Sequence, residues 1–144
     1  MNHARCIYLV SCVSQKKTTP SSARDLYVSQ WFVKARRHVE ATGMPWFILS
    51  AEYGLLDPDT VVAPYERTLN RMSIADRRAW AKRVAEVLVP RLVGVERVVV
   101  LAGERYREFL LPVLRAACRH VEVPMEGLPI GKQLQWFDMQ RGAA

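Results

Sequence analysis

The sequence has few cysteines and no long hydrophobic run. Its three cysteines, Cys6, Cys12 and Cys118, are scattered along the chain, so they predict neither a disulfide framework nor a zinc site. No run approaches the ~18 consecutive apolar residues that a membrane span needs. The first residues show no basic segment followed by an apolar stretch, so no secretory signal is predicted. We therefore expect a cytoplasmic protein that does not enter a membrane.

Residues that bind metals and cofactors are also scarce. The three histidines, His3, His38 and His120, are far apart, and none has another candidate ligand near it in the sequence. A metal centre needs several such ligands together. The polar stretch "VSQKK" contains no glycine, so it is not a Walker phosphate-binding loop. The sequence predicts no metal centre and no cofactor.

Basic residues clearly outnumber acidic ones. The 144 residues include 21 Lys and Arg against 14 Asp and Glu, which gives a net charge of +7 and a pI near 9.7. A positive potential of this size attracts phosphate-rich partners, although it can also serve solubility alone. With 50% hydrophobic residues, the chain can bury the core of one compact domain over residues 1–144.

Hydrophobic segments alternate between strand-like and helix-like patterns. Strands are expected at residues 6–12, 45–51, 97–102 and 121–125, and helices at 26–42, from 73 onward, at 103–120 and at 127–140. Residues 52–72 are expected to form a long loop, and Ser73 with Asp76 has the form of a helix-capping box. The alternation predicts an α/β fold with three layers and a four-stranded, mainly parallel sheet between helices.

Polar residues follow three of the expected strands. The stretches are "SCVSQKK", "SAEYGLLDPD" and "AGERYR". Ligands of parallel sheets bind beyond the carboxyl ends of the strands, so we expect Cys12, Glu52 and Glu104 to surround one cleft.

The side chains of these stretches have definite chemical uses. Glu52, with Glu104 as the second choice, can orient a water molecule or act as a general base, and Tyr53 and Tyr65 can stack on a base. The remaining candidates for substrate binding are Cys12, Ser14, Lys16, Lys17, Ser50, Gly54 and Tyr106. The alternatives are that Glu52 pairs with a nearby arginine and that the tyrosines pack beneath their loops.

Two motifs resemble known families. The stretch "LSAEYGLLDPDTVVAPYERTLN" resembles the signature region of YaaA-type peroxide-stress proteins, and "SCVSQKK" is similar to the Cys-Ser-x-x-Lys motif of the core domain of archaeosine synthases. The matching residues are Cys12, Ser14, Lys16, Ser50, Tyr53, Gly54, Leu55, Pro64 and Tyr65. The chain departs from the YaaA pattern at Glu66, where those proteins carry an arginine, and is much shorter than they are.

The resemblance implies a connection with nucleic acids and a fold like that of uracil-DNA glycosylase. YaaA proteins bind DNA and protect against oxidative damage, and archaeosine synthases act on a modified guanine in transfer RNA. We therefore expect a protein that acts on nucleobases or nucleic acid, chiefly DNA, by cleaving the bond between base and sugar. Two alternatives remain open: a DNA-binding protective protein without catalysis, and a nucleotide-binding module of a larger assembly.

Overall fold

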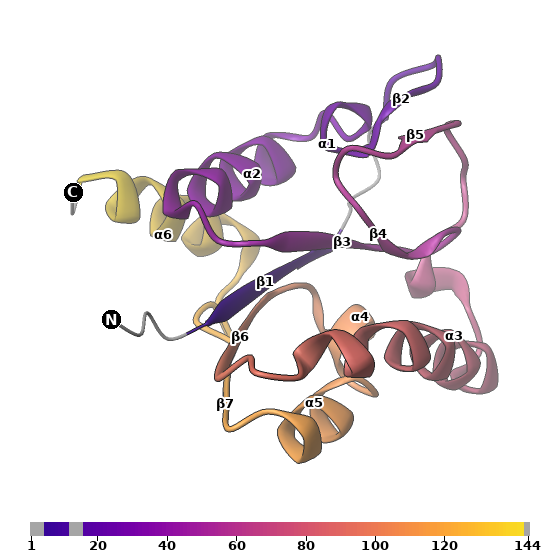
Figure 1. The fold of residues 1–144 in the computed structure, drawn as a ribbon. Helices are drawn as coiled ribbons and strands as arrows, with labels where there is room; N and C mark the ends of the chain where they lie inside the picture. Colours follow the sequence, from indigo (N-terminus) through magenta and orange to yellow (C-terminus); the bar gives the residue numbers. More distant parts are fainter. Residues whose placement is uncertain (1–4, 12–15, 143–144) are drawn as a thin grey trace.

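A five-stranded sheet forms the centre of the molecule (Figure 1). The computed structural model describes residues 5–11 and 16–142. The strand order is β4-β3-β1-β6-β7, with β4 at Gly54–Leu56, β3 at Trp46–Ser50, β1 at Cys6–Ser11, β6 at Arg97–Leu101 and β7 at His120–Glu122. All neighbouring strands pair in parallel except β4, which is antiparallel to β3. The predicted α/β class and mainly parallel sheet are confirmed, but the sheet has five strands and not the predicted four.

Strand β1 lies at the middle of the sheet and is buried along its whole length. Val10 has no exposed surface and pairs with Ile48 of β3 on one side and Leu101 of β6 on the other. A strand that is covered on both faces needs a continuous apolar run rather than an alternating one. The residues "CIYLV" supply that run, and this explains why the sequence alone located the strand.

Helices cover both faces of the sheet (Figure 1). One face carries α1 (Ala23–Leu26), α2 (Gln30–Thr42) and α6 (Ile130–Gly142), and the other carries α3 (Ile74–Leu88), α4 (Glu104–Arg107) and α5 (Leu111–Ala117). The result is the layered α/β arrangement that the alternating pattern predicts.

Local capping sets the ends of two helices. The Ser73 side chain accepts a hydrogen bond from the Asp76 N–H at 3.1 Å, so the predicted cap of α3 is confirmed. The helix expected from residue 26 begins instead at Gln30, because Ser29 caps it by accepting the Phe32 N–H at 3.2 Å. It ends as expected at Gly43, whose φ of 72° lies in the left-handed region that favours glycine.

Two segments differ from the prediction. The helix expected over residues 103–120 is divided into α4 and α5, and His120 already belongs to β7. Pro112 lies in the first turn of α5, where the lack of an N–H is tolerated. The expected loop over 52–72 contains β4, the short strand β5 (Val61–Val62) and a 3-10 turn, η1 (Leu69–Arg71). Strand β5 pairs with β2 (Ser21–Ser22), and a second 3-10 turn, η2 (Val89–Leu92), follows α3.

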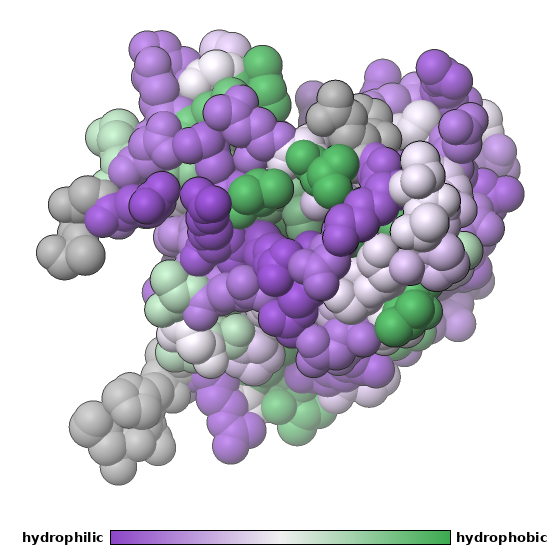
Figure 2. Space-filling model, turned by 90° about the horizontal axis from the view of Figure 1, so that it is seen from above, coloured by the Kyte–Doolittle hydropathy of each residue, from purple (hydrophilic) through white to green (hydrophobic). Residues whose placement is uncertain are grey.

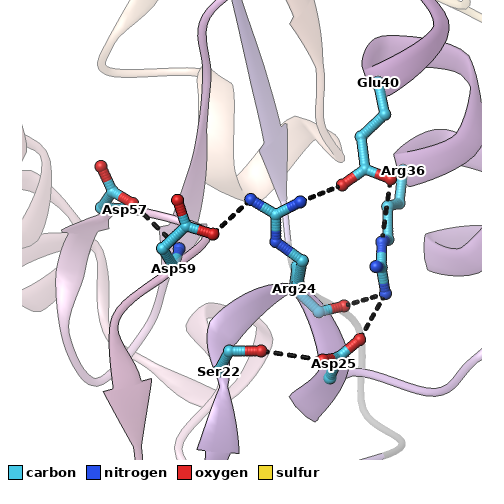
Figure 3. Close-up of polar contacts among 7 residues, drawn as sticks. All are labelled: Ser22, Arg24, Asp25, Arg36, Glu40, Asp57 and Asp59. Carbon is cyan, nitrogen blue, oxygen red and sulfur yellow. Dashed lines mark hydrogen bonds and ion pairs between the residues drawn. The ribbon is translucent and has the colours of Figure 1, made fainter.

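An ion-pair network joins α1, α2 and the chain before β5 (Figure 3). Arg24 contacts both Asp59 and the Glu40 carboxylate, the latter at 2.7 Å. Arg36 donates to Asp25 at 2.7 Å and also pairs with Glu40. The hydrogen bond from Arg36 is the main reason why the pKa of the Asp25 carboxyl lies below its usual range. These contacts hold the β2–β5 ribbon against α2.

The surface seen from above is mostly hydrophilic, and its hydrophobic residues form several separate patches (Figure 2). No single large apolar face dominates this view. Within the described ranges, no helix is both long enough and apolar enough to cross a bilayer.

Candidate functional site

A cavity of about 400 Å³ lies beyond the carboxyl ends of β1 and β6. We call it the central cleft. The residues in it that bear on chemistry are Ser11, Lys16, Arg67, Asn70, Glu104 and Arg105. Its position is the one at which parallel sheets bind ligands, so the expected site has a physical counterpart in the fold.

A direct hydrogen bond holds the two strand ends of the central cleft together. The Gly103 N–H donates to the Ser11 hydroxyl at 3.3 Å, and Ser11 itself is buried. Glu104 comes next, in the first turn of α4, with an exposed side chain. Among the described residues that line the central cleft, Glu104 is the one carboxylate.

Three cations line the central cleft together with Glu104. They are Lys16, Arg67 and Arg105. The Lys16 ammonium lies 4.4 Å from the centre of the Tyr65 ring, a cation–π distance that holds the lysine in place. A cleft with more cations than carboxylates attracts phosphate groups.

The side of the central cleft formed by α2 and α6 is more apolar. Trp31 and Ile130 line it, and the Trp31 indole N–H donates to the Gln133 side-chain oxygen at 2.8 Å. Gln133 also donates to the Leu128 carbonyl at 2.7 Å. These bonds fix the two helices at the edge of the cleft, where a flat apolar group such as a base can make contact.

Ser50 and Tyr65, both candidate ligand-binding residues, instead hold the end of β3. Ser50 is fully buried; its hydroxyl donates to the Tyr65 hydroxyl at 2.9 Å and accepts the Tyr53 N–H at 3.0 Å. The Tyr65 hydroxyl also lies 2.7 Å from that of Tyr27. The Ser50 hydroxyl is therefore engaged by Tyr65 and by the Tyr53 backbone.

Tyr53 ends the turn over residues 51–53 that reverses the chain from β3 into β4, and Gly54 is the first residue of β4. Gly54 has φ +70°, and a Cβ atom added at this position would lie 3.7 Å from the nearest atom, a methyl carbon of Val84. Its backbone conformation, rather than close approach of a ligand, therefore requires glycine. The Tyr53 hydroxyl donates to the Ala63 carbonyl at 2.9 Å. Neither residue lines the central cleft.

Glu52 lines a different cavity from Glu104. This outer cavity has a volume of about 700 Å³ and is also lined by Arg67 and Arg83. The Glu52 carboxylate lies 3.4 Å from the Arg67 guanidinium. This contact agrees with the alternative that Glu52 pairs with a nearby arginine. Glu52 follows β3 and Glu104 follows β6, on opposite sides of β1. They line separate cavities that share Arg67 and Thr68, whereas the sequence predicts one cleft around both.

The other expected residues are placed as follows. Cys12 and Ser14 lie outside the described residues. Lys17 is exposed, and its backbone N–H donates to the Leu26 carbonyl at 2.8 Å. Tyr106 borders the central cleft but is largely buried. Among the described residues, no group of His, Cys, Asp or Glu is arranged to hold a metal ion.

The segment Arg67–Arg71 separates the two cavities, and Arg67 and Thr68 border both. Leu69 anchors the segment: it is fully buried, and its N–H lies 3.5 Å from the Tyr106 hydroxyl. The sequence predicts only a loop for this segment. The only signal was the pattern "RTLNR", in which polar residues flank one leucine.

The fold and the central cleft define an α/β protein with a cation-rich cavity at the carboxyl edge of a mainly parallel sheet. The chain belongs to a family of unknown function, DUF6884, which matches residues 7–139. That range includes every described residue that lines the central cleft. Searches of curated proteins and of solved structures give no significant match.

Proposed function

We propose that the protein binds a nucleotide unit in the central cleft and hydrolyses its N-glycosidic bond, as DNA glycosylases do. One observation carries the proposal: a single carboxylate, Glu104, shares a cavity of about 400 Å³ with Lys16, Arg67 and Arg105. Cations are needed to bind phosphate, and a carboxylate is needed to activate water or to balance positive charge on the sugar.

Glu104 is assigned the catalytic role. Its side chain is exposed at the start of α4 and borders the central cleft. In the proposed reaction, Glu104 accepts a proton from water as the water oxygen forms a bond to the anomeric carbon. The bond from that carbon to the base breaks, and its electron pair leaves with the base. The base takes up a proton from solvent, and Glu104 returns its proton to solvent. The products are a free base and a sugar that carries a hydroxyl group.

The remaining groups are assigned to binding. Trp31 and Ile130 contact the base or sugar, and Lys16 and Arg105 contact phosphate. A base within a duplex would have to leave the stack to reach this cleft. Under this proposal Tyr65 acts on the substrate indirectly, because its ring holds the Lys16 ammonium in place through a cation–π contact.

The resemblance to YaaA-type proteins and to archaeosine synthases supports the same proposal. The sheet with helices on both faces is compatible with the uracil-DNA glycosylase-like fold that the resemblance implies, and we include that relationship in the proposal. DNA is the nucleic acid that the YaaA likeness favours.

A screen for base release tests the proposal. Oligonucleotides that carry damaged or modified bases are scored for abasic sites, and free nucleotides are scored for released base. Glu104→Gln should lower the rate by about 100-fold or more. Glu96→Gln is the matched control, because Glu96 is an exposed glutamate at the opposite end of β6.

Three results would contradict the proposal. The first is that the wild-type protein releases no base from any of these substrates. Binding without release would instead favour the non-catalytic DNA-binding alternative. The second is full activity of the Glu104→Gln variant, and the third is an equal loss in the Glu96→Gln control.

A further inference from the structure

A second cavity continues directly from the central cleft. We call it the side cavity; its volume is about 390 Å³. The two cavities share four lining residues, Lys16, Arg67, Thr68 and Asn70. Because so much of their lining is common, they form one groove that is larger than the central cleft alone.

The charges along this groove favour a ligand with more than one phosphate. Its cations are Lys16, Arg67, Arg71 and Arg105, against the two carboxylates Glu66 and Glu104. Arg71 lines only the side-cavity part of the groove, whereas Arg105 lines only the central cleft. Positive charge is therefore available at both ends of the groove, so that a second phosphate can find cations of its own.

The outer cavity also adjoins the side cavity and shares Glu66, Arg67, Thr68 and Arg71 with it, but it adds no net positive charge. Its three arginines, Arg67, Arg71 and Arg83, are matched by three carboxylates, Glu52, Glu66 and Asp76. A chain of phosphates is attracted to the excess of cations in the side cavity and not to the balanced charges of the outer cavity.

The groove is held by buried side chains. Leu69 has no exposed surface and anchors the turn that carries Arg67 and Arg71. The Lys16 ammonium rests 4.4 Å from the Tyr65 ring centre and 5.8 Å from that of Tyr27. Lys16, fixed in this way, loses little conformational freedom when a ligand binds.

We infer that the ligand is a single-stranded segment of nucleic acid rather than a free nucleotide. One unit occupies the central cleft, and the phosphate next to it in the strand lies in the side cavity beside Arg71 and Lys16. The inference rests on the proposed function, because it assumes that the central cleft binds a nucleotide unit. Each further phosphate that meets a cation releases counterions and strengthens binding.

Binding of oligothymidylates of one to six nucleotides tests the inference. Affinity should rise about tenfold between thymidine monophosphate and the two- or three-nucleotide strand, because the additional phosphate reaches Arg71, and should then level off. Arg71→Ala should remove about five- to tenfold of the affinity for strands. It should also reduce the slope of log K against log salt concentration by about 0.7. Binding of the monophosphate should change by less than about twofold.

Two other variants separate the possible failures. Arg83→Ala is the matched control, because Arg83 is an exposed arginine that lines the outer cavity; a loss equal to that of Arg71→Ala would overturn the inferred path. Equal affinity for the monophosphate and for strands, with no effect of Arg71→Ala, would overturn the inference and leave the proposed function standing. If Arg105→Ala weakens neither ligand, the central cleft is not the binding site and both proposals fail.

Discussion

Tyr65 tests how the end of β3 is held, because its hydroxyl and its ring have separate contacts. The hydroxyl accepts a hydrogen bond from Ser50 at 2.9 Å and lies 2.7 Å from the Tyr27 hydroxyl. Both partners are buried, with exposed fractions of 0% and 1%. The Lys16 ammonium lies 4.4 Å from the centre of the Tyr65 ring. Tyr65→Phe removes the hydroxyl and keeps the ring.

We expect Tyr65→Phe to lower the free energy of unfolding by about 2 kcal/mol. Each of the two hydrogen bonds contributes about 1 kcal/mol. For a chain of 144 residues the entropy of unfolding is about 0.3 kcal/mol/K, so this loss lowers Tm by about 7 °C. Nucleotide binding should change by less than about twofold, because Phe keeps the cation–π contact with Lys16.

Urea unfolding followed by tryptophan fluorescence measures this loss. Trp80 is a suitable reporter, because it is buried and its indole N–H donates to the Ser50 carbonyl at 2.9 Å. Tyr53→Phe is the matched control: Tyr53 is 39% exposed, so loss of its bond to Ala63 should cost less than about 0.5 kcal/mol. A Tyr65→Phe cost below about 0.5 kcal/mol at an unchanged m-value, or one no larger than that of the control, would refute the reasoning.

Two further predictions concern stability. Arg77→Met should lower the free energy of unfolding by about 2–4 kcal/mol, because Arg77 is buried and lies 2.8 Å from Glu108; an equal loss on Arg83→Met, at an exposed position, would contradict this. The ring centre of His38 lies 5.2 Å from that of Trp136, and burial lowers the pKa of the His38 imidazole. As the pH falls below about 6.5, His38 therefore becomes protonated in the unfolded chain before it does so in the folded protein. Stability should fall as pH drops from 6.5 to the folded pKa, and His38→Phe should flatten that fall; an unchanged pH profile in this variant would contradict the assignment.

The sequence predicted the buried strands well because each carries a local signal. Strands β1 and β6 are continuous apolar runs, as their burial on both faces requires. Strand β4 has only three residues, Gly54–Leu56, and its strand character comes from pairing with β3 rather than from its own composition. The break before Gln30 depends on the Ser29 cap, and a continuous helical pattern hides such a break.

The candidate site was predicted only in part, because its composition depends on strand order. The rule that ligands bind at the carboxyl edge located the cleft that contains Lys16 and Glu104. It could not show that β1 separates β3 from β6, and so it grouped Glu52 with Glu104. Arg67 borders the central cleft and Arg71 borders the side cavity because the chain between them is drawn into the core at Leu69. Spacing along the chain does not encode this long-range contact.

Glu52→Gln distinguishes a catalytic role for Glu52 from a role as the partner of Arg67. The two side chains lie 3.4 Å apart and are about one-third to one-half exposed, so the ion pair itself stabilises the fold little. Arg67 also borders the central cleft, and Glu52 therefore competes with phosphate for this arginine. Without that competitor, nucleotide affinity should rise about two- to fivefold and the rate of base release should stay unchanged. A catalytic Glu52 would instead give a rate loss of about 100-fold, and that result, with Glu96→Gln fully active, would move the catalytic carboxylate from the central cleft to the outer cavity.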